Sequence, residues 1–145
     1  MANLNPYLTF VGTCEEAFNY YKSIFGGDFA SLNRFGEMPP QEGITLTEEH
    51  KNLIMHVSLP IDGDTILMGS DAGGDWVPKT IVGNNISLMV NTDSREQADR
   101  FFSQLSLGGE IIMPLENTFW GSYFGQCTDR FGIGWMISFE EPVAE

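Results

Sequence analysis

The alternation of apolar and polar positions in the last third of the chain predicts three consecutive β-strands over residues 109–140. In the last strand Ile133, Trp135 and Ile137 fall on one face and smaller or softer residues fall on the other, because side chains alternate along a strand. Residues 129–132 end in glycine and have the composition of a tight turn. We therefore expect a hairpin with one face in the core and the other face able to line a cavity.

Two earlier segments have the apolar spacing of a helix. The first follows a capping-box pattern at residues 13–16 and ends at the glycine pair 26–27. The second follows a similar pattern at residues 94–97 and ends at the glycine pair 108–109. The two segments lie roughly eighty residues apart, and each has one predicted strand before it and three after it. Both halves of the chain therefore predict the order β-α-β-β-β.

This repeat sets the expected organisation of the chain. We predict one domain over residues 1–145, made of modules at approximately 4–71 and 84–140 joined by a connector at 72–83. Neither half has enough strands to bury its helix and sheet alone, so we expect one pseudo-two-fold α+β unit with a concave mixed sheet and the helices outside. Residues 36–52 are rich in proline, glycine and charge and predict a loop that covers a site or extends into solvent.

The acidic composition narrows the range of partners. The chain carries 20 acidic and 7 basic residues, for a net charge of -13. A nucleic acid needs clustered Lys and Arg to displace its counterions, and an acidic membrane surface repels a protein of this charge. We therefore expect no nucleic acid and no membrane among its partners, and the charge favours a neutral or cationic ligand.

The N-terminal residues and the cysteines favour a cytoplasmic location. The first residues lack the basic start and apolar run of a signal peptide, and no segment is as long as a membrane span. Cys14 and Cys127 have no CxxC spacing, which favours two reduced, buried thiols over a disulfide or a metal clip.

Several segments along nearly the whole chain resemble one protein family. The chain is similar to the vicinal oxygen chelate superfamily, which includes glyoxalases, bleomycin-resistance proteins and extradiol dioxygenases, and within it to the PhnB-like branch. Members pair two β-α-β-β-β modules around a ligand cavity, so the resemblance implies a ligand-binding protein with this fold and a homodimer. The matching segments are residues 6–10, 17–21, 25–27, 55–56, 67–71, 83–88, 113–115, 118–121 and 129–136.

The resemblance also shows where a metal would be held. Metal-dependent members draw His and Glu ligands from the first and last strands of each module. Neither residue type stands at the corresponding positions here, and thioether sulfur and amide groups are weak ligands for Zn, Fe(II) or Mn. We therefore predict no metal and no other cofactor, which puts glyoxalase, dioxygenase and thiol-transferase activities in doubt. The corresponding positions are Pro6 or Tyr7, Leu67 or Met68, Asn85, and Met136.

The predicted ligand-binding residues are polar, aromatic or methionine side chains expected on the concave side. His56 is expected to share a strand face with Ile54 and Ser58, where it could transfer a proton near neutral pH. The alternative is a histidine whose hydrogen bonds are satisfied by its neighbours. The full set is His56, Met68, Asn85, Ser87, Trp120, Tyr123 and Met136.

Some members of this set have an equally simple structural explanation. The methionines can fill an ordinary core. Trp120 and Tyr123 are expected on opposite faces of one strand, so only one faces inward unless a bulge at Gly121 changes the register.

We therefore predict a protein that binds a small organic molecule without a metal. The alternative is an enzyme of the same superfamily, a lyase, dioxygenase or transferase, that depends on a metal or on His56. Under both hypotheses the catalytic residues stay unknown from the sequence. It contains no nucleophile elbow, P-loop or Rossmann fingerprint, and no glycine-rich nucleotide loop supports the methyltransferase label that some PhnB-like sequences carry.

Overall fold

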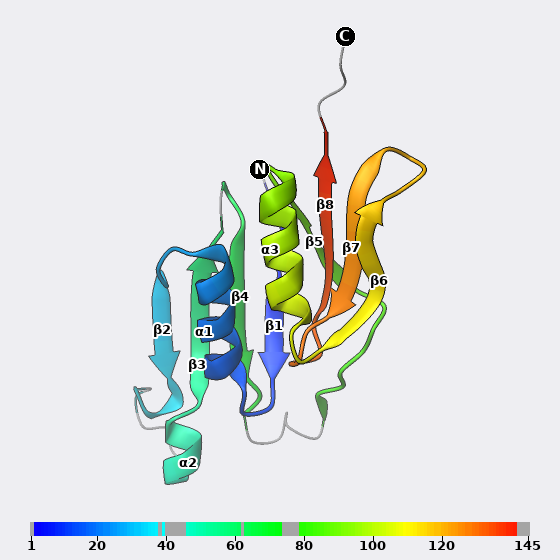
Figure 1. Ribbon diagram of the computed structural model, residues 1–145. Helices are drawn as coiled ribbons and strands as arrows, with labels where there is room; N and C mark the ends of the chain where they lie inside the picture. The colour runs from blue at the N-terminus through cyan, green and yellow to red at the C-terminus, as the bar shows by residue number, and fades with distance from the viewer. Residues whose placement is uncertain (1, 38, 40–45, 62, 74–78, 142–145) are drawn as a thin grey trace. The chain divides into compact units, whose positions relative to one another are not determined.

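A computed structural model describes residues 2–37, 39, 46–61, 63–73 and 79–141. The chain forms two compact units, Met1–Ile81 and Val82–Glu145. Each unit has one four-stranded mixed sheet with a long helix along one face (Figure 1). This arrangement confirms the predicted α+β class and the two tandem β-α-β-β-β modules. The packing of the two modules into one pseudo-two-fold unit stays a prediction.

The first unit has the strand order β1-β4-β3-β2, in which β1 and β4 are parallel and the other pairs are antiparallel. Its elements are β1 (Tyr7–Phe10), α1 (Cys14–Phe25), β2 (Ser31–Arg34), β3 (Ile54–Pro60) and β4 (Ile66–Asp71).

Helix α1 packs against β3 and β4 through the residues that its sequence spacing predicts. Ala17, Phe18, Tyr21 and Ile24 are buried. A Cβ atom on Gly69 would lie 2.6 Å from Cε1 of Phe18, so the absence of a side chain lets the ring reach the backbone of β4. The buried residues of the two strands, Val57, Leu59 and Leu67, complete this core.

A β-bulge changes the predicted faces of β3. Asn33 pairs with His56, but the next residue of β2, Arg34, pairs with Ile54, so Met55 is the extra residue. Ile54 is therefore fully buried like Val57, and it does not share a face with His56 as predicted from simple alternation. His56 remains on the face away from α1.

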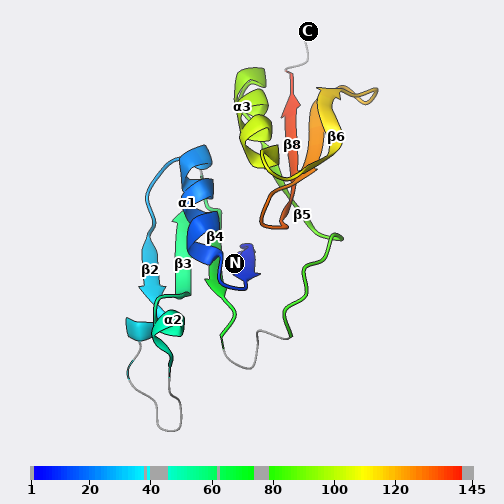
Figure 2. The same cartoon turned by 60° about the horizontal axis from the view of Figure 1, so that its bottom comes forward.

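The predicted loop over residues 36–52 contains two short helices. The 3-10 helix η1 (Phe35–Glu37) and the single turn α2 (Glu48–Lys51) lie together beside one end of the sheet (Figure 2). Thr47 caps α2, since its Oγ1 accepts a hydrogen bond from the His50 amide at 3.1 Å. The described residues do not include 38 and 40–45 of the predicted loop, residue 62 between β3 and β4, or residues 74–78 of the predicted connector.

The second unit repeats the order with β5-β8-β7-β6, in which β5 and β8 are parallel. Its elements are β5 (Ser87–Asn91), α3 (Arg95–Ser106), β6 (Glu110–Asn117), β7 (Ser122–Thr128) and β8 (Gly134–Glu140). The three strands predicted over residues 109–140 are confirmed.

Helix α3 covers one face of this sheet with Ala98, Phe101, Phe102 and Leu105. A Cβ on Gly125 of β7 would lie 2.9 Å from Cε2 of Phe102, which places Gly125 and its neighbour Cys127 on the helix side. The alternating residues of β7 therefore face away from the helix.

The two long helices begin in different ways. Ser94 caps α3 as predicted, because its Oγ accepts a hydrogen bond from the Gln97 amide at 3.1 Å. The Thr13 side chain makes no such bond at the start of α1, so the capping box predicted there is wrong. The hydrogen-bond acceptor at the start of α1 is instead Asp71, at the end of β4. One of its carboxylate oxygens accepts bonds from the amides of Gly12 and Cys14.

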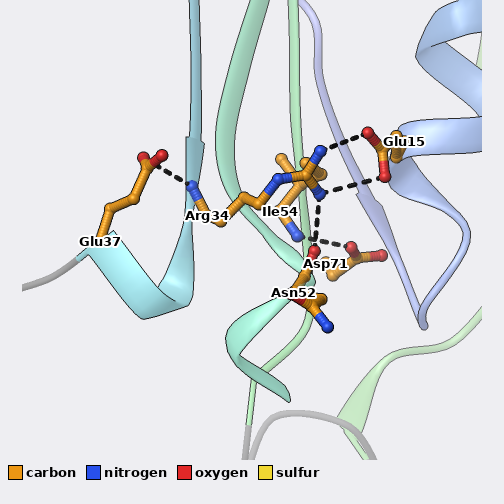
Figure 3. Close-up of polar contacts among 6 residues, drawn as sticks. All are labelled: Glu15, Arg34, Glu37, Asn52, Ile54 and Asp71. Carbon is orange, nitrogen blue, oxygen red and sulfur yellow. Dashed lines mark hydrogen bonds and ion pairs between the residues drawn. The ribbon is translucent and has the colours of Figure 1, made fainter. Parts of the chain in front are cut away.

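A small polar cluster surrounds this carboxylate (Figure 3). The second oxygen of Asp71 accepts a bond from the Ile54 amide at 2.9 Å, so one side chain joins the starts of α1 and β3. Nearby, Arg34 donates to both carboxylate oxygens of Glu15 and to the carbonyl of Asn52. These bonds from Arg34 hold the pKa of the Glu15 carboxyl below its usual value.

No helix within the described ranges is both long enough and apolar enough to pass through a lipid bilayer.

Candidate functional site

The face of the second sheet away from α3 carries two adjacent rows of side chains. Strand pairing places Ser87, Gly134 and Thr128 side by side across β5, β8 and β7. Two residues further along each strand, on the same face, Met89 pairs with Met136, and Met136 pairs with Gln126. The second row ends at Met113 of β6. We call this second row the methionine row; it consists of Met89, Met136, Gln126 and Met113.

A pocket of about 120 Å³ opens on the first of these rows. Its walls come from four strands, from the segment before β5 and from the β7-β8 turn, and every lining residue is uncharged. Ile112 reaches the pocket from β6, at an irregularity in the pairing between Ile111 and Met113. The lining residues are Gly83, Asn84, Ser87, Ile112, Gln126, Thr128, Gly132 and Gly134.

Asp129 follows the pocket residue Thr128 in the chain, but its carboxylate is hydrogen-bonded within the β7-β8 turn and to Trp135. One oxygen accepts bonds from the amides of Phe131 and Ile133, and the other accepts one from the indole nitrogen of Trp135 at 2.8 Å. Only 3% of Asp129 is exposed, so its carboxylate is enclosed by the predicted turn and does not face solvent.

The face of the first sheet away from α1 gathers aromatic, hydroxyl and thioether groups. Met68 pairs with Tyr7 on β1 and with Ser58 on β3. The ring of Tyr7 stacks on that of His56, with centroids 5.9 Å apart and planes at 28°. Ser58 in turn shares a hydrogen bond of 2.8 Å with the Ser31 hydroxyl. His56 and Met68 are thus brought to one face, together with Tyr7, which the ligand set omitted.

The remaining predicted ligand residues are spread more widely. Ser87 and Met136 lie in the two adjacent rows, whereas Asn85 is exposed ahead of β5. Trp120 lies in the β6-β7 turn and not in a strand. Its ring packs against the rings of Phe119 and Phe124.

Tyr123 points to the helix side of its sheet. Its hydroxyl donates to Asp99 of α3, and this bond raises the pKa of Tyr123. The guanidinium of Arg95 lies 4.2 Å from the ring centroid. Tyr123 therefore binds the sheet to α3 and is separated from both open-face rows.

The predicted ligand-binding set did not include Gln126 and Thr128, which line the pocket. Both residues alternate along β7 with the small or buried residues Gly125 and Cys127.

Neither thiol is suited to act as a nucleophile. Cys14 and Cys127 are free and fully buried. Burial raises the pKa of Cys127 to about 11 and raises the pKa of Cys14 strongly in the same direction. Both groups are therefore protonated near neutral pH, where the reactive thiolate would be needed.

We expect both thiols of the native protein to react slowly with a thiol-specific disulfide reagent at about pH 8 and quickly after unfolding in guanidinium. Because folding raises both pKa values, the thiols favour the folded state fully below their unfolded pKa of about 8.5, and this contribution is lost as the pH rises further. Absorbance of the released thiol measures the rate. Equally fast labelling with and without guanidinium would contradict the burial of these groups.

The donor groups on the open faces do not fit the metal sites that the family resemblance implies. Within the described residues, no three His, Cys, Asp or Glu side chains lie close enough together to hold an ion. The corresponding positions offer a phenol at Tyr7 and thioethers at Met68 and Met136 within the strands, and a neutral amide at Asn85 ahead of β5. A hard or borderline divalent cation favours imidazole and carboxylate over such a set.

Comparison with known proteins identifies relatives along nearly the full length. The model of the 3-demethylubiquinone-9 3-methyltransferase family matches residues 2–138. The chain is 32% identical to the protein YjdN of Escherichia coli K12 over 142 aligned positions, and the match covers 93% of this chain and 93% of that protein.

Solved structures agree with this result. Protein PA1353 from Pseudomonas aeruginosa has a TM-score of 0.81 at 36% identity, covering 98% of this chain and 100% of that one. A PhnB protein from Bacillus cereus has a TM-score of 0.75 at 25% identity, covering 95% and 99%. FosX, a fosfomycin resistance protein from Listeria monocytogenes, shares the fold alone, with a TM-score of 0.62 at 9% identity over 97% and 93%.

Proposed function

Because this chain belongs to the PhnB-like 3-demethylubiquinone-9 3-methyltransferase family, we propose that it binds a small organic molecule on the open faces of its sheets. The fold that it shares with a fosfomycin resistance protein is consistent with a small-molecule ligand. The observation that carries the proposal is the side-chain content of these faces. Both present methionines beside uncharged hydrogen-bonding groups, and one contains a pocket.

Methionine and neutral polar groups suit a binding role. Met89 and Met136 are unbranched and polarizable, so they can adapt to an apolar ligand surface. Hydroxyl and amide groups beside them would fix its orientation, which is the usual composition of a small-molecule site. We further propose that binding needs no metal, since the donor set fits one poorly. The methyltransferase activity in the family's name is not part of the proposal, because the sequence lacks a glycine-rich nucleotide loop.

His56 supports a second hypothesis, an enzyme that uses this imidazole as a general base. It lies on the open face of the first sheet in contact with Tyr7, and Tyr7 pairs with Met68 on the neighbouring strand. An imidazole in this position could accept a proton from a bound molecule. This hypothesis also includes a metal held by a nonstandard set of ligands.

We expect a screen of neutral and cationic drugs, small carbonyl compounds and phosphonates to identify compounds that raise the melting temperature. A ligand at about one hundred times its Kd stabilises the folded state by about 2.7 kcal/mol, which is a shift of several degrees. The Met136→Asn variant should weaken binding of compounds that use the methionine row. Leu4→Asn is the control, since Leu4 is 97% exposed and lies outside both sheets.

Metal analysis of protein purified without chelator separates the two hypotheses. Near-stoichiometric Zn, Mn or Fe would end our preference for metal-free binding. Failure of every compound to change the melting temperature would contradict the proposed function itself.

The resemblance also leads us to propose a cytoplasmic homodimer. The edge strand β6 and the turn after it expose apolar side chains that a second copy would cover, including Ile111 and Phe119.

A further inference from the structure

We propose that the pocket on the second sheet binds an uncharged, planar carboxamide head group, with the apolar or aromatic body of the ligand lying over the methionine row. This inference rests on the proposed binding function and names the chemical class that this part of the open face selects.

The size of the pocket indicates a head-group site. Its volume of about 120 Å³ is somewhat below the roughly 150 Å³ cavity that is known to hold benzene. It is far below the roughly 300–1,000 Å³ of sites that enclose a whole drug-sized ligand. A carboxamide and part of an attached ring fill such a space, and the rest of the molecule extends beyond it.

The lining selects against charged groups of either sign. All its side chains are neutral, so a bound ion would lose water without gaining an opposite charge, which is costly. The chain's net charge of -13 opposes anions further. A cation would need a carboxylate, and both oxygens of the neighbouring Asp129 already accept hydrogen bonds from the turn and from Trp135.

The same lining favours an amide over a hydrocarbon. Gln126 offers both an amide donor and a carbonyl acceptor, and the hydroxyls of Ser87 and Thr128 can each donate and accept. A carboxamide presents the complementary pair in one plane. A purely apolar group would leave these lining atoms without water or partner, and its binding would be weaker for that reason.

Gly134 keeps the floor of the pocket open. A Cβ at this position would lie 2.9 Å from Oγ of Ser87 and 3.2 Å from the carbonyl oxygen of Ile86. A methyl group there would occupy the space between the central strand and Ser87. The Gly134→Ala substitution therefore obstructs the pocket and displaces the Ser87 hydroxyl, while it removes no polar lining atom.

The methionine row is placed to receive the body of the ligand. Gln126 belongs both to the pocket lining and to this row, where it lies between Met136 and Met113. A ring attached to an amide at Gln126 would thus lie over neighbouring thioethers, which make favourable contacts with aromatic rings.

Three probes of nearly equal shape test the charge preference. Benzamide is neutral, benzamidine is cationic and benzoate is anionic at neutral pH. We expect benzamide to bind at least about tenfold more tightly than either ion, since no lining group compensates a charge. Kd values come from titrations of ¹⁵N-labelled protein followed by two-dimensional NMR, which also locates the shifted amides.

Substitutions test the location. Gln126→Leu, Thr128→Val and Gly134→Ala should each weaken benzamide binding several-fold or more, while Leu4→Asn, which lies outside both sheets, should leave it unchanged. The NMR spectrum of each variant shows whether it is folded. If one of the other variants does not fold, the nearly isosteric Thr128→Val still tests the location.

The outcomes separate this inference from the function on which it rests. Equal or tighter binding of benzamidine or benzoate would overturn the head-group assignment, as would benzamide binding that none of the folded pocket variants changes. A protein that binds other compounds from the screen but not benzamide would also overturn the inference, while the binding function stands. If no compound of any class binds, the proposed function fails.

Discussion

Replacing Asp71 with alanine is expected to reduce the free energy of unfolding of the first unit by about 3 kcal/mol. Asp71 is 3% exposed, and its carboxylate accepts hydrogen bonds from the amides of Gly12, Cys14 and Ile54 at 2.9 to 3.0 Å. The bonds to Cys14 and Ile54 are buried, and each buried donor left without a partner costs about 1–3 kcal/mol. Water can replace the partner of the part-buried Gly12 amide.

Urea unfolding followed by circular dichroism at 222 nm measures this effect, with separate transitions fitted if the two units unfold independently. Asp71→Asn should lie between the native protein and Asp71→Ala, because the amide keeps one acceptor oxygen. Asp64→Ala is the matched control: Asp64 is exposed, so its loss should change stability by no more than about 0.5 kcal/mol. Equal stabilities of the Asp71→Ala and Asp64→Ala proteins would show that the carboxylate does not join α1 to β3.

Gly109→Ala is expected to destabilise the second unit by at least about 3 kcal/mol or to prevent its folding. A Cβ at Gly109 would lie 2.0 Å from the carbonyl oxygen of Thr128 and 2.8 Å from the carbonyl carbon of Asp129. Both are backbone atoms at the end of β7, so neither can move aside without breaking the pairing of this strand with its neighbours.

The adjacent glycine supplies the control. Gly108 has a φ of +80°, and its nearest atom to an added Cβ is Cδ of the flexible Arg130 side chain at 3.4 Å. Gly108→Ala therefore brings mainly the backbone penalty of a left-handed residue, about 1 kcal/mol. Thermal and urea unfolding of the two variants should differ clearly, and similar losses in both would contradict the close approach of Gly109 to Thr128.

The helices and most strand faces could be predicted from the sequence because they depend on local spacing. The buried positions of α1 and α3 follow the helical period, and the buried Trp135 and Ile137 of β8 follow strand alternation. The face of Ile54 could not be predicted in this way. Its bulge adds one residue to β3, and the count of alternating positions is wrong from there on.

The start of α1 shows a second limit. Thr13 is the side chain that local rules select, but the acceptor for this helix comes from Asp71, 57 residues after Cys14. Likewise, the glycine pairs after the two helices look equivalent in sequence, yet the second residue of the later pair is required by contact with a distant strand.

The candidate site was predictable only in part for a related reason. Alternation along single strands placed Ser87 and Met136 correctly on the open face. The pocket, however, depends on which residues of different strands stand side by side. Gln126 and Thr128 become neighbours of these residues only through the pairing of β7 with β8, which no local pattern in β7 specifies.

The different origins of the two helix caps affect the order in which a chain emerging from the ribosome can complete them. The second helix has its acceptor in Ser94, so it is complete as soon as its own first turn has been synthesised. The N-terminal cap of the first helix cannot form until residue 71 has emerged, because its acceptor is the last residue of β4. Although it is made first, its N-terminal turn gains its partner only when nearly the whole of the first unit has been translated.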